Sequence, residues 1–263
     1  MMKLLSIISI ILMGVAIPVQ GTQQPFSRSE FHTVRDYVND IYKHGNNPTS
    51  TPNKKWFNTH KGAFGYVEYD AKKNNIVAAF RGTVNIINMM QNIKLDLVSY
   101  ANCAGCRVHK GFMETYQSAR NQVLASIINF RKTHPTAKIY VTGYSLGAAQ
   151  AVYCTADLYK AGIQANLMTF GTPRPGNRNF ANYINKIVTG LNYRIIYQSD
   201  KIPIILSKLM GFFNHGTEVN FWKSYFPRKQ YKYKIYPKFQ DNTNLFRLYN
   251  LIDHIRANYE KME

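Results

Sequence analysis

One stretch of the sequence decides the fold: KIYVTGYSLGAAQAVYCTADLYKA, residues 138–161. Its first five residues are mostly apolar or β-branched and predict a short strand, and a helix is predicted from Leu146 onward. Gly143 and Gly147 frame Ser145 between these two elements. Gly-x-Ser-x-Gly at a strand-to-helix junction predicts a tight turn that raises the serine hydroxyl above the edge of a sheet. Ser145 is therefore a candidate nucleophile.

Strands and helices alternate along the rest of the chain. Strands are predicted at residues 64–70, 75–80, 138–142, 166–170, 193–197 and 231–235, and helices at 31–42, 111–131 and 146–161. The first two strands predict a hairpin, and the Tyr/Lys alternation of the last one predicts a half-exposed antiparallel strand. Strands that alternate with helices predict an α/β fold, with a mostly parallel sheet covered by helices on both faces.

The N-terminus has the pattern of a secretory signal peptide. The first three residues include one positive charge, Lys3, and an almost wholly apolar run follows them up to Val19. Cleavage after Gly21 would leave residues 22–263 as a single domain, because no linker-like stretch divides them. We therefore expect a secreted protein, with an uncleaved signal anchor as the alternative.

The three cysteines and seven histidines limit the possible chemistry. Cys103 and Cys106 could close a tight disulfide loop in an exported protein, and Cys154 lies in an apolar stretch typical of a buried side chain. The histidines show no metal-ligand spacing, so we expect no metal and no cofactor.

The formal net charge of +19 is large for 263 residues. Such a charge favours anionic surfaces, membrane lipid among them. The basic residues are scattered and no nucleic-acid motif is present, so we expect no nucleic-acid partner. A compositional bias without function is the alternative.

A serine nucleophile needs a histidine to take its proton and a carboxylate to orient that histidine. The acid is expected before the histidine in the chain. Asp200 follows a predicted strand and is the best acid, whereas Asp157 lies within the helix after Ser145. His254 and His215 both remain candidates for the base, with a slight preference for His254 because it follows the acid by a longer excursion.

The oxyanion that forms during acyl transfer needs two hydrogen-bond donors held in place beforehand. The backbone N–H of Leu146, directly after the nucleophile, is the first. The run Phe80-Arg81-Gly82-Thr83 follows an earlier strand, and Thr83 offers both an N–H and a hydroxyl as the second.

Several ordered blocks of sequence resemble the class 3, or fungal-type, lipases. These blocks are residues 80–83, 103–112, 143–147, 169–177, 199–203 and 253–254. The resemblance implies an α/β-hydrolase fold, a triad of Ser145, Asp200 and His254, and oxyanion donors from Thr83 and Leu146. It also implies a disulfide between Cys103 and Cys106, and it places His215 outside the catalytic set.

The chain departs from the usual family pattern at Tyr144, Ala148 and Lys201, the last of which puts a cation beside the acid and favours its ionised form. None of these changes removes a catalytic group.

The segment from Val84 to Ile93 is apolar on one side, polar on the other and free of charge. In family members with lipid substrates the corresponding segment is a helical lid, so the resemblance implies a lid here; an ordinary core helix is the alternative. Its apolar residues, which we expect to contact the substrate, include Ile86, Ile87, Met89 and Met90.

The sequence thus predicts a secreted serine ester hydrolase. We expect a triacylglycerol or acylglycerol lipase that acts through an acyl-enzyme at a membrane or droplet interface, and that also binds anionic lipid surfaces. A phospholipase A1, a general carboxylesterase and a catalytically inactive lipid-binding protein are the alternatives.

Overall fold

A computed structural model describes residues 25–83, 85–91, 93–198, 200–225 and 230–237. Its centre is an eight-stranded sheet in the order β1-β2-β3-β6-β7-β8-β9-β10. The five strands from β3 to β9 in this order are parallel, and β1, β2 and β10 pair antiparallel at the two ends. The predicted α/β fold with a mostly parallel sheet is confirmed.

The strands of the large sheet are β1 (Lys54–Asn58), β2 (Phe64–Asp70), β3 (Asn75–Phe80), β6 (Lys138–Tyr144), β7 (Asn166–Phe170), β8 (Asn192–Tyr197), β9 (Thr217–Ser224) and β10 (Gln230–Tyr236). Two short strands, β4 (Leu97–Ser99) and β5 (Arg107–His109), form a separate pair. The helices are α1 (Arg28–Asp40), η1 (Ile41–Lys43), α2 (Ile86–Gln91), α3 (Lys110–Thr133), α4 (Leu146–Lys160), α5 (Arg178–Ile187), α6 (Ile202–Ile205) and η2 (Lys208–Met210).

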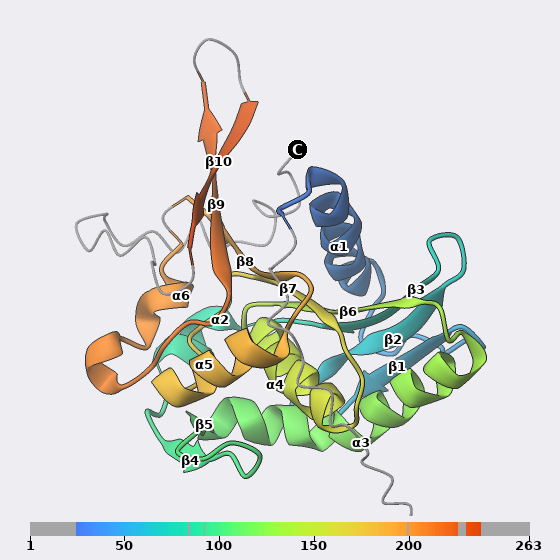
Figure 1. The fold of residues 1–263 in the computed structure, drawn as a ribbon, viewed down its shortest axis with the longest axis horizontal. Coiled ribbons are helices and arrows are strands. Elements are labelled where there is room, and N and C mark those ends of the chain that lie inside the picture. Colours follow the sequence, from blue (N-terminus) through green and yellow to red (C-terminus); the bar gives the residue numbers. More distant parts are fainter. Residues whose placement is uncertain (1–24, 84, 92, 199, 226–229, 238–263) are drawn as a thin grey trace, which may run out of the picture.

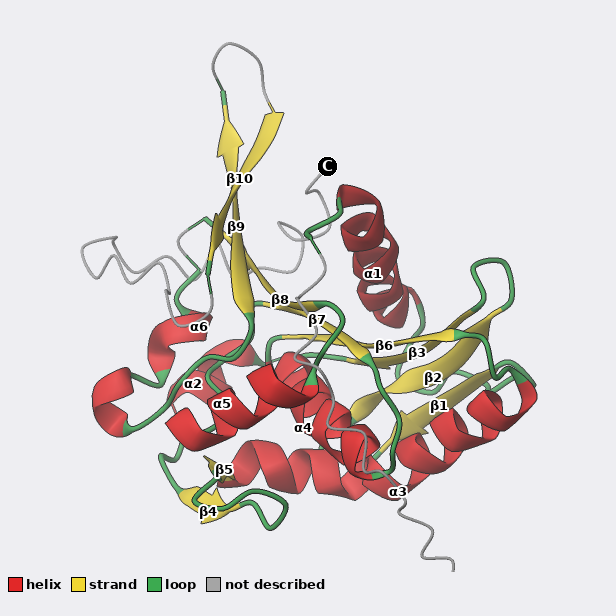
Figure 2. Ribbon diagram, in the orientation of Figure 1, coloured by secondary structure: helices red, strands yellow, loops and turns green. Residues whose placement is uncertain are grey.

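Helices cover both faces of the sheet, as the sequence predicts (Figures 1 and 2). The helices α3, α4 and α5 pack on one face and α1 packs on the other. In β3, Ile76, Ala78 and Phe80 belong to the core under α3 and α4, whereas Val77 and Ala79 belong to the core under α1. Successive side chains of a strand point to opposite faces, so a strand buried on both faces must be a continuous apolar run.

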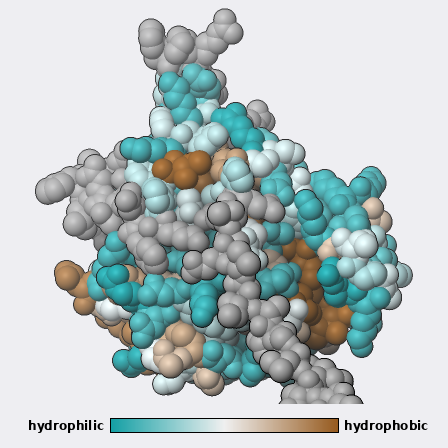
Figure 3. Space-filling view, in the orientation of Figure 1, coloured by the Kyte–Doolittle hydropathy of each residue, from teal (hydrophilic) through white to brown (hydrophobic). Residues whose placement is uncertain are grey.

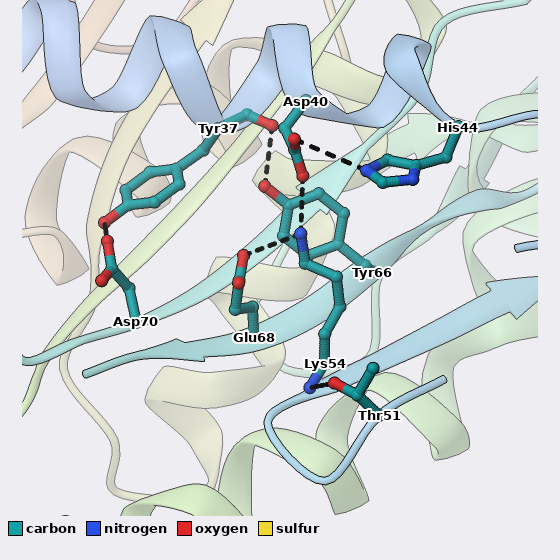
Figure 4. A network of polar contacts seen from close by, with 8 residues as sticks. All are labelled: Tyr37, Asp40, His44, Thr51, Lys54, Tyr66, Glu68 and Asp70. Atoms are coloured by element: carbon teal, nitrogen blue, oxygen red, sulfur yellow. Dashed lines mark hydrogen bonds and ion pairs between the residues drawn. The ribbon is translucent and has the colours of Figure 1, made fainter. Parts of the chain in front are cut away.

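Polar contacts hold α1 against the antiparallel end of the sheet (Figure 4). The hydroxyl of Tyr37 on α1 donates to Asp70 at the end of β2 over 2.8 Å. The ammonium group of Lys54 on β1 lies 2.5 Å from Asp40 and 3.1 Å from Glu68. These contacts fix the helix that precedes η1, and η1 in turn reaches the candidate active site.

Most strand and helix predictions are confirmed within a few residues. Seven elements of the described residues were not predicted: the strands β1, β4, β5 and β9 and the helices α5, α6 and η2. In the described part of the chain, no helix combines the length and the apolar content needed to cross a membrane.

Candidate active site

Ser145 occupies a strained turn between β6 and α4. Its backbone has φ 55° and ψ −125°, a positive φ that residues other than glycine rarely adopt. Its N–H donates to the carbonyl oxygen of Phe170 on β7 over 2.9 Å, which ties the turn to the neighbouring strand. The residue is only 1% exposed, so the nucleophile is covered in this conformation.

The two glycines of the turn are required by close backbone approaches. A Cβ on Gly143 would lie 2.5 Å from the carbonyl oxygen of Gly147. A Cβ on Gly147 would collide with the carbonyl oxygens of Phe80 and Arg81. The start of α4 therefore lies directly against the backbone that leaves β3, which is the segment predicted to supply the second oxyanion donor.

The loop after β3 is held beside the nucleophile. A Cβ on Gly82 would lie 3.0 Å from the Cβ of Ser145, which shows how close the two segments run. The N–H of Gly82 donates to the hydroxyl of Tyr42 in η1 over 3.0 Å. Thr83 follows and is half-buried, and its hydroxyl accepts from the N–H of Asn85 over 3.4 Å.

Leu146 is the first residue of α4, where backbone N–H groups have no partner within the helix and the helix dipole is positive. The structure thus brings Ser145, Leu146 and the Thr83 loop together at one edge of the sheet. This arrangement can hold a negatively charged oxygen beside an attacking hydroxyl.

Asp200 lies at the same edge of the sheet as Ser145. It follows β8, which is separated from β6 only by β7, and all three strands are parallel. The residue is 5% exposed, and its Oδ1 accepts from the N–H of Ile202 over 2.9 Å at the start of α6. The neighbouring Lys201 is also buried.

Of the two candidate bases, the structure describes only His215. His254, together with Asp253, lies outside the described residues. His215 precedes β9 at the opposite edge of the sheet, since Thr217 pairs with Tyr193 near the beginning of β8. It is fully buried, its Nδ1 lies 3.0 Å from Oδ1 of Asn192, and burial, followed by the charge of Arg194, lowers its pKa to about 3.

Asp157 has a structural role, as its position within α4 suggests. Its carboxylate accepts from the hydroxyls of Tyr100 and Tyr116 over 3.2 and 2.9 Å and from Nε of Arg120 over 2.5 Å. These contacts join the far end of α4 to α3.

A pocket of about 390 Å³ lies beside the nucleophile turn, between α2 and the beginning of α3. Its apolar lining includes Met89, Ile93, Phe112 and Leu146. Its charged residues are Lys94, Asp96, Lys110 and Glu114. The volume falls within the range of small-molecule sites, and the presence of Leu146 brings the pocket to the predicted oxyanion donor.

The predicted lid segment contains the short helix α2. Ile86 and Met89 are half-buried and belong to neither apolar core, while Ile93 packs on the core under α3 and α4. The side chains of Ile87 and Met90 lie outside what the structure describes.

Two residues near the site were not singled out from the sequence. Tyr42 is the first, through its contact with Gly82. His109 is the second: it lines the pocket, caps α3 by accepting from the N–H of Phe112 over 3.2 Å, and has a pKa lowered by burial. A histidine directly before a predicted helix is a weak signal for a cap, and no local pattern indicates the contact of Tyr42.

The cysteines lie as predicted. Cys103 and Cys106 form a disulfide, and Cys154 is free and buried, with a pKa raised by that burial. Among the residues that the structure describes, no group of three or more His, Cys, Asp or Glu side chains could hold a metal ion.

Comparisons with known proteins agree with this geometry. The family model described as "Lipase (class 3)" matches residues 77–210, about half of the 263-residue chain. A secreted mono- and diacylglycerol lipase of Fusarium solani is 34% identical over 164 residues, which cover 62% of this chain and 48% of that protein. A lipase of Rhizomucor miehei is 36% identical over 155 residues, which cover 57% of this chain and 42% of that protein.

The chain therefore spans less than half of the length of these two relatives. Among solved structures, lipase II from Rhizopus niveus superposes with a TM-score of 0.70 at 27% identity, over 86% of this chain and 92% of that one. The strained serine turn, the sheet order around it and the family match lead to one conclusion: the chain belongs to the class 3 lipase family.

Proposed function

We propose that this chain is a secreted serine ester hydrolase that cleaves acylglycerols at lipid–water interfaces. One observation carries the proposal: Ser145 is held in a strained turn at the start of α4, against the loop that leads to Thr83, and a pocket with an apolar wall of Met89, Ile93 and Phe112 reaches the adjacent Leu146. A nucleophile, a site for negative charge and room for an acyl chain therefore lie side by side.

In the first half of the reaction, Oγ of Ser145 attacks the ester carbonyl carbon and His254 takes the hydroxyl proton. Asp200 orients His254 and stabilises its charged form. The carbonyl oxygen becomes an oxyanion, which the N–H of Leu146 and the donors of Thr83 bind, each contributing about 3 kcal/mol. When the tetrahedral intermediate collapses, the alcohol leaves with the proton from His254 and the acyl group stays on Ser145.

In the second half, His254 takes a proton from a water molecule, and the resulting hydroxide attacks the acyl carbonyl. Collapse of this second intermediate releases the fatty acid and returns the proton to Oγ of Ser145. No cofactor or metal enters either half of the reaction.

The segment around α2 supports lipid as the substrate. Met89 and Ile93 form one wall of the pocket, and Ser145 is almost completely covered in this conformation. Displacing α2 onto a lipid surface would open the pocket and transfer its apolar side chains to the lipid, at about 1 kcal/mol for each half-buried side chain. We therefore propose that α2 is a lid.

The relatives named as secreted lipases and the predicted signal peptide at residues 1–21 support secretion, with the catalytic domain in residues 22–263. The net charge of +19 supports binding to anionic lipid surfaces and favours a phospholipase A1 activity as the second candidate.

Hydrolysis of a soluble short-chain chromogenic ester tests the proposed chemistry. We expect Ser145→Ala and His254→Ala to abolish the activity of the wild-type protein while both variants remain folded. A wild-type protein no more active than Ser145→Ala would leave only the inactive lipid-binding alternative. Rates on emulsified triacylglycerol, diacylglycerol and phosphatidylcholine vesicles then separate a lipase from a phospholipase.

The lid proposal needs a separate experiment. The rate should rise abruptly once the ester exceeds its solubility, and the double variant Met89→Ser/Met90→Ser should reduce that rise while leaving hydrolysis of soluble esters intact. Met210→Ser is the matched control, because Met210 is half exposed and does not line the pocket. Smooth saturation of the wild-type rate through the solubility limit would disprove a working lid.

A further inference from the structure

The hairpin of β9 and β10 projects from the body of the molecule (Figures 1 and 2), and its two faces differ. On the inner face the rings of Phe221 and Tyr233 lie 5.3 Å apart, and the ring of Phe26 lies 5.1 Å from that of Tyr233. On the outer face Trp222, Lys232 and Lys234 are exposed. The inner face therefore packs against the core under α1, and the outer face is exposed at Trp222, Lys232 and Lys234.

The outer face combines an aromatic ring with positive charge. Trp222 pairs directly across the strands with Lys232, and Lys234 lies two residues further along the same face. Tyr225, just past the end of β9 and beside Lys223, extends the exposed surface on the other side of the strand and is 72% exposed. We refer to Trp222, Tyr225, Lys232 and Lys234 as the hairpin surface. In Figure 3 the described part of the hairpin nearest its tip is hydrophilic to intermediate.

No acidic side chain offsets this charge within the described part of the hairpin. Its one carboxylate, that of Glu218, is 2% exposed and lies 3.4 Å from the guanidinium group of Arg194 on β8. The ammonium group of Lys223, near the end of β9, lies 5.4 Å from the centre of the Tyr225 ring and adds a further positive charge. The exposed part of the hairpin is therefore positive.

The position of the hairpin relates it to the proposed catalytic edge. Phe221 pairs with Tyr197, the last residue of β8, so Trp222 and the residues after it extend beyond the end of that strand. Asp200 follows the same strand end by three residues. The hairpin surface thus begins at the edge of the sheet that carries Asp200, and a lipid surface bound there would lie on the same side as the reaction.

Lysines mixed with amphipathic tryptophan and tyrosine rings suit one partner best. Such rings favour the headgroup level of a bilayer, and lysines near a membrane are attracted by anionic head groups. We propose that the hairpin surface docks this enzyme on lipid surfaces that carry anionic head groups, at a place separate from the pocket under α2. This inference rests on the proposed action at lipid interfaces and adds the residues that hold the enzyme there.

The first test measures binding of the full chain, in a Ser145→Ala background that leaves the lipid intact, to sedimented vesicles. Phosphatidylcholine vesicles with and without 30% phosphatidylglycerol, a composition of about one anionic lipid in three, are compared. Each lysine near the membrane should contribute about fivefold in affinity. We therefore expect Lys232→Glu/Lys234→Glu to weaken binding to the anionic vesicles at least about tenfold.

The control Lys132→Glu/Lys160→Glu changes the net charge equally at exposed positions near the ends of α3 and α4, at the opposite edge of the sheet. It should weaken binding by less than about threefold, because charge far from the membrane is screened. Equal losses in the two double variants, or no binding of the parent protein to anionic vesicles, would overturn the proposal. So would a hairpin variant that loses affinity for heparin but not for vesicles.

The second test uses fluorescence, since the chain has two tryptophans, of which Trp56 is buried and Trp222 is exposed. Anionic vesicles should shift the emission to shorter wavelengths, and Trp222→Phe should remove the shift. A shift that survives in Trp222→Phe would place the contact elsewhere. Hydrolysis of a soluble short-chain ester, measured with Ser145 intact, should be unchanged by the hairpin substitutions. A hairpin variant that loses vesicle binding but keeps full esterase activity is therefore impaired in docking alone. An inactive parent protein would instead contradict the proposed function.

Discussion

Tyr42→Phe removes the hydroxyl that accepts the N–H of Gly82 over 3.0 Å. Gly82 is buried, so the substitution leaves a buried backbone donor without this partner, at a cost of about 1–3 kcal/mol. Gly82 directly precedes Thr83, whose donors we propose for the oxyanion. Relaxation of the loop should therefore move those donors away from the positions that the transition state requires.

The magnitude has a lower and an upper bound. If the whole cost of about 1–3 kcal/mol appears in the transition state, kcat falls about 5-fold to 150-fold. Complete loss of one oxyanion donor sets the upper bound at about 100-fold to 1,000-fold. KM should change little, because the oxyanion forms only after the substrate has bound.

The assay is steady-state hydrolysis of a soluble short-chain ester, with thermal unfolding measured alongside. Tyr153→Phe is the matched control: Tyr153 is fully buried, and its hydroxyl donates to the carbonyl oxygen of Pro175 over 2.7 Å. Both variants should lose stability, but only Tyr42→Phe should lose kcat. An unchanged kcat in Tyr42→Phe, or equal losses in both variants, would refute a positioning role for Tyr42.

Three further substitutions probe the frame around the site. Gly147→Ala should lower the melting temperature and reduce kcat more than about 100-fold, since its Cβ would collide with the carbonyl oxygen of Phe80; Gly45→Ala, with open space around its Cβ, should do neither. Asp157→Asn should lower the free energy of unfolding in urea by about 1–2 kcal/mol while the folded protein keeps its kcat, because it weakens the hydrogen bonds of a buried carboxylate far from the nucleophile, whose partner Arg120 is partly exposed. Because burial depresses the pKa of His215 to about 3, the unfolded chain binds the proton first on acidification, so stability should fall between about pH 6.5 and pH 3. Between pH 6 and pH 4 this amounts to about 2 kcal/mol, and a His215→Asn variant with an equally steep loss would contradict the assignment.

The elements that the sequence predicts share a simple pattern. The strand β3 is a continuous apolar run, and α3 repeats its buried residues at helical spacing, so both can be recognised without knowing their neighbours. The strand β9 could not be recognised in this way, because its buried positions include Glu218 and Asn220. Arg194, 24 positions earlier in the chain, lies beside this buried carboxylate in the folded sheet and compensates its charge.

Some residues of the candidate site can likewise be recognised from local sequence, whereas others depend on tertiary contacts. Ser145, its glycines and Leu146 form one contiguous motif, and Asp200 follows a recognisable strand, so local sequence is enough to propose them. Tyr42 cannot be found by the same reasoning, since its contact with Gly82 spans 40 residues and depends on how η1 packs. The covering of Ser145 is likewise a tertiary property, because its 1% exposure is set by segments packed over the turn and not by the turn itself.

The strain at Ser145 explains why so much of α4 is buried. A positive φ at a residue with a side chain costs about 1–3 kcal/mol and persists only when the surroundings leave the chain no alternative. At the start of α4, the absence of a Cβ on Gly147 lets the helix rest on the backbone at the end of β3. Along the helix, small and fully buried side chains bring it close to the sheet: Ala148, Ala149, Ala151 and Ala156. At its far end Asp157 is held by three donors from outside the helix. With both ends and one whole face fixed, α4 cannot move away to relax the turn, so its packing keeps the nucleophile raised above the sheet edge before any substrate binds.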